Sequence, residues 1–522
     1  MRRRKFIQSA ATGIVVPTII NGIPANAFSA NSQLSELLNP TVDTDHVMVL
    51  IFLSGGNDGL NTVIPLDQYG NLSVARPNIL IPSNEVLRLN GNSNVGLHPA
   101  LGGLQTLYNE QKLSIIQSVG YPLPNFSHFR STDIWTSASD ANQVIDSGWL
   151  GRYLDSEFPG FPLNYPNANN PDPLAIQLGA NLPLLFQGPN AQMAMNVSNP
   201  DIFGGWPNGV NDPTDNTPRG TEINYIRTIS RQSKSYADAL IASYLKGTNV
   251  AQYPAANYLG DTLKAVARLI KGGLKTRLYL VGLFGFDTHA EQGKGTGAHA
   301  GLLQQLGDAV LSFQRDLEGM NLSKRVIGMT FSEFGRRVKD NASNGTDHGA
   351  AGPMFVFGES IQSGVLGANP QISSNVSVND NVPMQFDFRT IYASVLKDWF
   401  CVNSGQQDQI LLKKFNSLPI IKNNCSTTSI EDYHLSVERL RVKCYPNPLV
   451  ETAIVELSTE RGQLQIQLFD PLGRLVKVIY SGKVEAGLHK FSFENEDFPP
   501  GNYHLRVSHG ILQKSVLIQI AQ

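Results

Sequence analysis

Carboxylate and imidazole side chains recur at four places in this 522-residue chain, each at or just beyond the end of an apolar run. Hard divalent cations bind carboxylate oxygens, and zinc accepts carboxylate and imidazole together. One Asp-His pair is weak evidence, because such pairs are common at ordinary surfaces. Four such places predict a metal or anion site, and a metal there would be a divalent ion: zinc, manganese, magnesium or calcium. The candidate ligands are Asp58, Asp287, His289, Glu333, Asp347 and His348.

The stretch 45–66 shows how such a residue is positioned. Its apolar run 47–53 predicts a buried parallel strand, and the motif SGGNDG (54–59) follows directly. Glycine lets the backbone turn sharply and approach a ligand, and open α/β sheets bind ligands at the carboxyl ends of their strands. Asp58 therefore either holds a metal or substrate, or caps the helix that follows.

Alternating strand and helix patterns place these residues in one α/β domain, residues 45–420. Apolar runs predict strands at 112–120, 276–286, 323–335 and 353–358, and helical spacing predicts helices at 227–245, 257–273, 299–319 and 389–400. This order favours a doubly wound, mainly parallel sheet flanked by helices. The carboxyl ends of such strands share one edge, so we expect the candidate ligands to converge in one cleft.

The N-terminus predicts export. Residues 1–27 combine a basic start (RRRK, 2–5), an apolar stretch (14–20) and a small-x-small cleavage site (ANA, 25–27), which is the pattern of a signal peptide. RRKFI (3–7) resembles the twin-arginine signal, which implies the twin-arginine translocase as a partner. The alternative is an ordinary secretory signal with extra basic residues. Residues 28–44 are expected to be a linker.

The C-terminus has a different character. After an expected linker at 421–440, short alternating strands in residues 441–522 predict a small all-β sandwich. YPNP (445–448), FDPLGRLV (469–476) and PPGNYHLRVSHG (499–510) resemble the C-terminal sorting domain of the type IX secretion system of Bacteroidetes. The resemblance implies the type IX machinery as a partner and passage through the outer membrane, to the cell surface or the medium.

Composition excludes several classes of protein. Lys and Arg total 41 against 43 Asp and Glu, with no basic stripe, so we expect no nucleic-acid partner. No apolar run after the signal is long enough for a stable transmembrane segment. The three cysteines, 401, 425 and 444, form no CxxC pattern, which argues against a thiolate metal site. Cys401 and Cys425 can pair in an oxidising compartment, but the odd count leaves the pairing open.

Seven motifs in order over residues 45–400 are similar to the family known as domain of unknown function 1501. That family is grouped with the alkaline phosphatase-like and sulfatase-like hydrolases, which implies an alkaline phosphatase-like doubly wound fold. The activity of most members is not established, so the resemblance implies a fold more firmly than a substrate. The motifs are GGNDGLNTVIP, LHPAL, SHFRSTDIW, GWLGRYLD, GFDTHAEQ, TFSEFGRRVKDNASNGTDHGAAGPMFVFG and FDFRTIYASVLKDW.

The resemblance implies roles for the metal ligands. Asp58 matches the metal-binding carboxylate after the first strand, and Asp287 with His289 matches a later Asp/His pair that the superfamily commonly spaces more widely. The next ligands in the superfamily are an adjacent Asp-His pair and then a separate His before a short strand. These remaining ligands can be aligned with this sequence in two ways.

In one alignment Asp347-His348 is the adjacent pair and the later His is absent. In the other, Glu333 takes the place of the pair's Asp, Phe334 stands where its His would be, and His348 is the later His. We favour the second, because the preceding apolar strand ends at Ser332-Glu333, whereas Asp347 follows a polar loop. It lacks one imidazole ligand, which favours one metal, a harder metal or none.

The resemblance also implies a nucleophile at a helix N-terminus after the second strand, where the helix dipole lowers its pKa. Ser127, Ser131 and Thr132 lie there, and the absence of cysteine excludes a formylglycine-type sulfatase. Ser127 is the first candidate; alternatively it only caps the helix. His128 and Arg336 either bind an anionic oxygen of the substrate or lie on solvated faces.

Two functions therefore remain open from the sequence. One is an exported metal-dependent hydrolase of phosphate or sulfate esters, in which the metal polarises the ester. The other is a non-catalytic surface or extracellular binding protein that keeps the hydrolase fold. The uncertain nucleophile and the missing imidazole favour the second, and the strand-end Asp and His residues favour the first.

We expect the mature chain to begin near Phe28, after the ANA site, and to reach the outer surface or the medium. N-terminal sequencing of the protein recovered from each cell fraction and from the medium of its native host measures the first residue and the location of the mature chain. Recovery of the full-length chain from the cytoplasm would contradict the predicted export.

Overall fold

The structure is a computed structural model in which the chain forms two compact units, Met1–Cys425 and Ser426–Gln522, each described here by itself. The predicted signal peptide lies outside the described residues, apart from two short paired strands, β1 (Ile19–Ile20) and β2 (Ile23–Pro24). Most of the two predicted linkers lies outside them too. The other described residues are 44–163, 165–197, 215, 217–422, 425, 442–459, 462–470, 474–495, 498–509 and 512–521.

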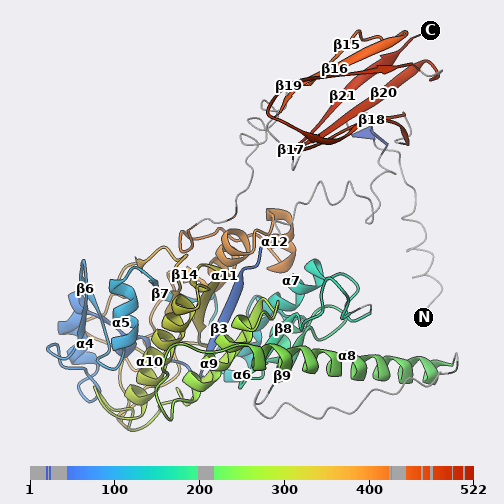
Figure 1. Ribbon diagram of the computed structural model, residues 1–522. Helices are drawn as coiled ribbons and strands as arrows, with labels where there is room; N and C mark the ends of the chain where they lie inside the picture. Colours follow the sequence, from blue (N-terminus) through green and yellow to red (C-terminus); the bar gives the residue numbers. More distant parts are fainter. Residues whose placement is uncertain are drawn as a thin grey trace. The chain divides into compact units, whose positions relative to one another are not determined.

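A nine-stranded sheet forms the centre of the first unit (Figure 1), in the order β13-β7-β12-β11-β3-β10-β8-β9 with β14 beside β7. Every described strand of this sheet except β12 runs in the same direction. The strands are β3 (Val47–Ser54), β7 (Leu113–Gly120), β8 (Ala175–Leu178), β9 (Ala194–Val197), β10 (Leu278–Phe284), β11 (Val326–Phe331), β12 (Gly352–Phe357), β13 (Gly364–Leu366) and β14 (Phe386–Asp387).

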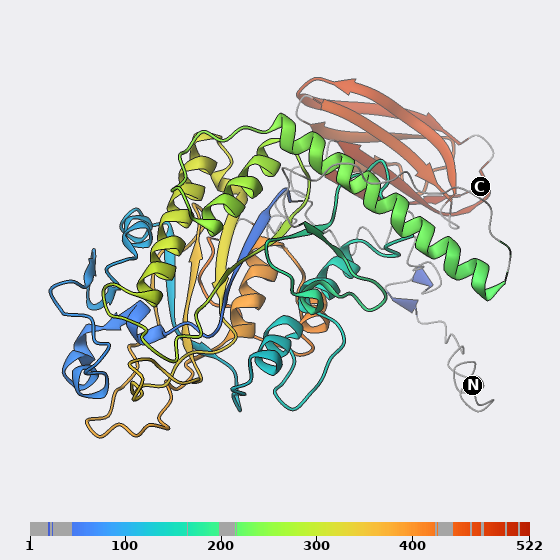
Figure 2. The same cartoon turned by 90° about the horizontal axis from the view of Figure 1, so that it is seen from below.

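Helices cover both faces of this sheet, which explains the unbroken apolar runs of its strands. Alternate residues of β3 enter two separate cores: Met48 and Leu50 join one, and Val49 and Ile51 join the other. Figure 2 shows helices on both sides of the strands. The first core includes α6 (His128–Ser137), α7 (Trp149–Glu157) and α11 (Phe388–Ser394); the second includes α5 (Gly102–Asn109), α9 (Tyr258–Lys271) and α10 (Ala298–Gly319).

This architecture confirms the predicted fold class, a doubly wound and mainly parallel sheet, and several elements differ from the sequence prediction. β8 and β9 were not predicted, because they are only four residues long and lie among Asn- and Pro-rich loops. The strand expected at 323–335 is shorter, because η5 (Ser323–Arg325) precedes β11 and the chain turns away after Phe331.

The remaining elements of the first unit surround the sheet. The long helix α8 extends away from the sheet (Figure 1). The elements are β4 (Val63–Pro65), β5 (Leu87–Leu89) and β6 (Asn92–Leu97) in a small antiparallel sheet, with α3 (Gly59–Thr62), η2 (Leu66–Gln68), α4 (Tyr69–Ala75), η3 (Pro183–Phe186), α8 (Pro218–Lys246), the π-turn η6 (Val395–Trp399) and α12 (Ser404–Ile410).

The first unit continues past the predicted end at residue 420. Ile421 pairs with Ile361 in a β-bridge, and Cys425 forms a disulfide with Cys401. Cys444 is the free cysteine. Across the part of the chain that the structure describes, no helix is both long and apolar enough to cross a membrane.

The second unit is all β, as predicted for a sandwich. Two antiparallel sheets, β15-β16-β19 and β18-β17-β20-β21, enclose one apolar core that includes Val455, Ile466 and Leu505. Alternation of apolar and polar residues along each strand supplies this core. The strands are β15 (Val442–Tyr445), β16 (Thr452–Thr459), β17 (Gly462–Phe469), β18 (Leu475–Val484), β19 (Gly487–Glu494), β20 (Gly501–His509) and β21 (Leu512–Ile520).

We expect a chain that ends at Cys425 to unfold cooperatively on heating, because its sheet and both cores lie within the first unit. Calorimetry of this chain and of the full-length protein measures the transition. In the matched control, Cys425→Ser in the shortened chain opens a loop of 24 residues and should lower the free energy of unfolding by about 3 kcal/mol. A shortened chain without a cooperative transition would place the domain boundary elsewhere.

Candidate metal centre

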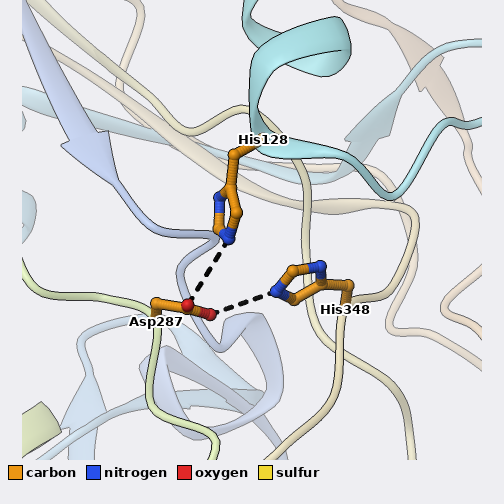
Figure 3. Close-up of side chains that lie close together, drawn as sticks. All are labelled: His128, Asp287 and His348. Carbon is orange, nitrogen blue, oxygen red and sulfur yellow. Dashed lines mark hydrogen bonds and ion pairs between the residues drawn. The ribbon is translucent and has the colours of Figure 1, made fainter.

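Side chains from three connections of the sheet meet in one cluster. His128 begins α6 after β7, Asp287 and His289 lie on the loop after β10, and His348 lies just before β12. His289 Nε2 and His348 Nε2 each lie 3.1 Å from Asp287 Oδ1. His128 Nε2 lies 3.5 Å from Asp287 Oδ2. Figure 3 shows the rings of His128 and His348 turned toward the Asp287 carboxylate.

Each of these histidines has its other ring nitrogen bonded to an oxygen. A neutral imidazole that donates through Nδ1 keeps a lone pair on Nε2. Nε2 is therefore the ring nitrogen of each histidine that faces the Asp287 carboxylate, and His289 Nε2 lies 2.9 Å from His348 Nε2. The Nδ1 acceptors are Glu333 Oε1 for His128 (2.8 Å), the Phe126 carbonyl for His348 (2.7 Å) and Asp347 Oδ1 for His289 (3.1 Å).

Charge around the cluster keeps Asp287 ionised. Burial by itself raises the pKa of this carboxyl, but hydrogen bonds from Arg336 and His348 outweigh it and lower the pKa to about 2. Burial also lowers the pKa of His348, despite its bonds to the Phe126 carbonyl and to Asp287. Asp287 is thus held as a carboxylate, which is the form that binds a metal ion, and the lowered pKa of His348 favours its metal-binding form.

Asp347 lies beside the cluster through its bond to His289. A hydrogen bond from Asn341 Nδ2 (3.0 Å) is the main cause that lowers the pKa of the Asp347 carboxyl, with His289 adding to it. Asp347 thus orients the His289 ring, in the way that an acceptor behind a ligand histidine orients it toward a metal.

Glu333 holds His128 and is buried, with 1 % of its surface exposed. Besides His128 Nδ1, its carboxylate accepts the backbone N–H groups of Gly55 (2.9 Å) and Gly56 (3.3 Å). Both glycines have positive φ, +122° and +80°, which turns these N–H groups toward the carboxylate. Glu333, predicted as a metal ligand, thus supports a cluster histidine from behind.

Asp58 lies outside the cluster, although it was predicted as a metal ligand. It is fully buried, and both of its oxygens lie 2.7 Å from Arg76 Nη1. Burial raises the pKa of the Asp58 carboxyl, but Arg76 outweighs it and the pKa falls below its usual value. Arg76 supplies the positive charge that a metal was expected to supply. Asp58 precedes α3 but makes no side-chain cap bond, so the capping alternative is not observed either.

Arg336 is also buried, with 1 % of its surface exposed, whereas the sequence offered it as a residue that binds an anionic oxygen or lies on a solvated face. Its Nη2 donates to Asp287 Oδ1 (2.6 Å) and to the Phe286 carbonyl (3.0 Å), Nε donates to the Gly56 carbonyl (2.6 Å), and Nη1 to the Thr346 carbonyl (2.8 Å). The guanidinium therefore holds the loops of the cluster together.

Ser127 is exposed at the N-cap of α6, next to His128. Its hydroxyl makes no cap bond, so the side-chain capping alternative is not observed. Its N–H donates to Asn125 Oδ1 (2.8 Å), and Tyr121 Oη accepts the Asn125 N–H (3.0 Å), which fixes the loop before the helix.

The donors around Asp287 fit a metal ion. Ligand atoms of His128, Asp287 and His348 all lie within 4.8 Å of one another. Imidazole nitrogen with one carboxylate oxygen is a donor set that zinc accepts, and magnesium and calcium prefer oxygen alone. The ring centroid of Phe334 lies 4.5 Å from that of His348, so an aromatic side chain packs beside the cluster.

The fold and the cluster together define a doubly wound α/β protein with a histidine- and carboxylate-lined strand edge. Residues 235–411 match the family described as "Protein of unknown function (DUF1501)", and residues 443–520 match the "Secretion system C-terminal sorting domain". Both resemblances drawn from the motifs are thereby confirmed, and the second implies secretion to the outer surface or the medium. No curated protein matches the sequence.

Solved structures similar to this chain include members of the alkaline phosphatase superfamily. A protein of that superfamily from Vibrio parahaemolyticus has 10 % identity, a TM-score of 0.32, and coverage of 92 % of this chain and 84 % of its own. A sulfatase from Pseudoalteromonas sp. has 10 % identity, a TM-score of 0.30, and coverage of 89 % and 87 %. PorZ, a surface component of the type IX secretion system of Porphyromonas gingivalis, has 16 % identity and a TM-score of 0.13; 20 % of this chain covers 14 % of PorZ.

Sequence reasoning did not identify Arg76 and Gln292, the two buried hydrogen-bond partners of Asp58. It offered His128 as a residue that binds an anionic oxygen or lies on a solvated face. The only signal for Gln292 was its place in the motif GFDTHAEQ, and Arg76 had none. His128 stands next to Ser127, so its part in a metal cluster becomes visible only when the end of β7 is placed beside β10 and β12.

We expect Asp58→Asn to lower the free energy of unfolding by about 3–5 kcal/mol, because it leaves Arg76 buried without a carboxylate. Asp287→Asn should lower the free energy of unfolding by less, because the Asp287 side chain is 46 % exposed and Arg336 keeps its carbonyl partners. Urea unfolding of both variants and the wild type, with a chelator present, measures the two losses. Small and equal losses would contradict a buried Arg76–Asp58 pair.

Proposed function

We propose that this protein is an exported zinc-dependent hydrolase of phosphate or sulfate esters. The observation that carries the proposal is the convergence of three imidazole Nε2 atoms on the Asp287 carboxylate, with each Nδ1 already bonded to an oxygen. Nitrogen and oxygen atoms held this close, with His289 Nε2 2.9 Å from His348 Nε2, need a proton or a metal ion between them. Ligands oriented from behind in this way are typical of a metal site.

The zinc ion, when bound, supplies Lewis-acid chemistry that polarises the ester oxygens and stabilises the leaving oxygen. His128, Asp287, His289 and His348 would hold it. Arg336 keeps Asp287 ionised through the 2.6 Å bond to its Oδ1, so that this ligand needs no deprotonation at neutral pH.

Ser127 is the proposed nucleophile. It is exposed, its hydroxyl makes no cap bond, and it stands at the N-terminus of the ten-residue helix α6. The helix dipole favours the alkoxide form of a hydroxyl at this end, and backbone N–H groups of the first turn favour the oxygens of a phosphoryl or sulfuryl group. The next residue, His128, is one of the proposed metal ligands, so Ser127 is adjacent to the metal site in sequence.

A second candidate is a surface protein that binds metal without turnover. It is favoured by Arg130 and Arg337, which are close in sequence to His128 and Arg336 and whose guanidinium groups bond backbone carbonyls. Arg130 Nη2 donates to the Ala141 carbonyl (3.2 Å), and Arg337 Nε to the His348 carbonyl (2.8 Å). With Arg336 buried, an anionic substrate would depend on the metal and the helix N-terminus for its positive partners.

The route of export completes the proposal. The sorting domain implies the type IX machinery, and the basic N-terminus supports the twin-arginine translocase for the first membrane. The twin-arginine route in general carries folded proteins, so a metal bound in the first unit before export would travel with it.

We expect the metal-free protein to bind one zinc ion per chain and to melt at a higher temperature with zinc, because binding to the folded state alone stabilises it. His348→Ala should weaken zinc binding by at least about tenfold, and lower pH should weaken it further, because protons compete for Nε2. Calorimetric titration measures the zinc stoichiometry and affinity of each protein, and thermal unfolding measures the change in melting temperature. The control is His504→Ala, which removes an exposed histidine of the second unit and should change nothing. Unchanged melting with zinc would contradict the metal site.

Turnover separates the two candidate functions. Zinc-loaded protein should hydrolyse 4-nitrophenyl phosphate or 4-nitrophenyl sulfate, and Ser127→Ala should lower kcat while leaving zinc affinity unchanged, because a nucleophile contributes to the chemical step. Zinc binding without hydrolysis of either ester would favour the non-catalytic surface protein. Hydrolysis that survives Ser127→Ala undiminished would remove Ser127 from the mechanism.

A further inference from the structure

Gln292 connects three loops at one edge of the sheet through one buried amide. The residue is 0 % exposed, on the loop between β10 and α10. Its Nε2 donates to Asp58 Oδ2 (2.6 Å), while its Oε1 accepts the hydroxyls of Thr288 and Thr346, both at 2.9 Å. The three partners follow β3, follow β10 and precede β12.

The two threonines are next to the ligands of the proposed metal site. Thr288 lies between Asp287 and His289, and Thr346 stands two residues before His348. A backbone bond from the Thr346 N–H to the Thr288 carbonyl (3.1 Å) runs beside the two hydroxyl bonds. A shift of the Gln292 amide would therefore move both ligand-bearing loops.

Asp58 and Arg76 fix which way this amide faces. An ionised carboxylate accepts hydrogen bonds only, so the Asp58 oxygen requires the NH₂ side of the amide. The carbonyl side must then face the two threonines. Arg76 keeps Asp58 ionised, and its own Nε is held by the Val338 carbonyl (2.6 Å).

We propose that Gln292 is a positioning residue that sets the spacing of the metal ligands Asp287, His289 and His348, and that Asp58 with Arg76 sets the orientation of Gln292. The inference rests on the proposed metal site and deepens it. Asp58 then contributes to metal binding through Gln292, without touching the ion. Residues behind metal ligands typically change metal affinity by about 10–100-fold when they are replaced.

Gln314 provides a matched comparison for a purely structural glutamine. It is also 0 % exposed, in α10, and its Nε2 donates to Glu318 Oε1 (3.0 Å). No hydrogen bond of the described residues joins its side chain to a strand exit. Replacement of either glutamine by methionine keeps the chain length and removes a buried amide. Gln314 loses one hydrogen bond, because its Oε1 has no partner among the described residues, and Gln292 loses three, so the stability losses differ and zinc affinity is the property compared.

The first experiment compares Gln292→Met with Gln314→Met by calorimetric titration of each metal-free protein with zinc. We expect Gln292→Met to weaken zinc binding by at least about tenfold and Gln314→Met to change it less than twofold. Thermal unfolding of the metal-free proteins shows that both variants are folded. Folded Gln292→Met with wild-type zinc affinity would overturn the proposal.

The second experiment exchanges the amide and the carboxylate. Gln292→Glu places a second carboxylate beside Asp58, and Asp58→Asn leaves Arg76 without its anion. The double variant Asp58→Asn/Gln292→Glu again has one carboxylate and one amide beside Arg76. We expect each single variant to weaken zinc binding and the double variant to restore it to within about threefold of wild type, because contacting residues are not additive. A double variant whose loss of zinc affinity equals the sum of the two single losses, in free energy, would overturn the proposed coupling of Asp58 and Gln292.

A metal-free measurement separates this proposal from the proposed function. We expect Gln292→Met to shift the imidazole NMR resonances of His289 and His348 in the absence of metal. His46, which stacks on Trp399 with ring centroids 3.9 Å apart, should be unaffected. A wild type that binds no zinc refutes the metal site, and unchanged His289 and His348 resonances in Gln292→Met refute the positioning role. Shifted resonances support it in either case.

Discussion

The buried guanidinium of Arg336 is the interaction on which the arrangement of this edge depends. It bonds the carbonyls of Gly56 after β3 and Phe286 after β10, and the Thr346 carbonyl in the segment before β12. Carbonyl oxygens at the ends of parallel strands have no partners within the sheet, and burying them unpaired is costly. One planar group with donors on three nitrogens satisfies carbonyls from all three connections, and its charge also offsets Asp287 (2.6 Å). The loops are therefore positioned by the protein before any ligand arrives.

Two arginines also bear on how many cations the proposed metal site could take. Asp58 and Asp287 are both strand-exit carboxylates, yet their surroundings differ: Asp58 is fully buried on Arg76, and Asp287 is half-exposed with Arg336 on one side only. The Arg76 guanidinium already supplies the positive charge that a metal ion would supply to Asp58. A metal ion that replaced Arg76 at Asp58 would leave the buried guanidinium unpaired, which is costly. The remaining anionic side of Asp287 faces imidazoles, which favours a single zinc-type site.

The fold could be predicted from the sequence wherever burial leaves a long periodic pattern. Both-face burial gives β3 its seven-residue apolar run, and α10 has apolar residues at helical spacing, so these elements were expected within a residue or two of where they lie. β12 was expected as a strand, but its antiparallel direction was not, because strand direction depends on the path of the connecting loop. The four-residue strands β8 and β9 depend on pairing with a neighbour and have too few residues for a pattern.

The site was less predictable, because the role of a carboxylate depends on its partner and the partner is not near in sequence. Asp58 and Asp287 have the same local signature, a carboxylate just beyond a strand, yet one partner is 18 residues away and the other 49. Glu333 is a similar case, since its backbone partners, Gly55 and Gly56, are nearly 280 residues away in sequence. Glu333 was predicted as a metal ligand, and in the structure its carboxylate accepts a hydrogen bond from His128. The strand-end rule therefore finds which residues share an edge, and burial decides which of them face solvent and which face another side chain. At this edge the buried carboxylates, Asp58 and Glu333, are bonded to arginine, amide and backbone N–H groups, whereas Asp287 and Asp347 keep exposed oxygens.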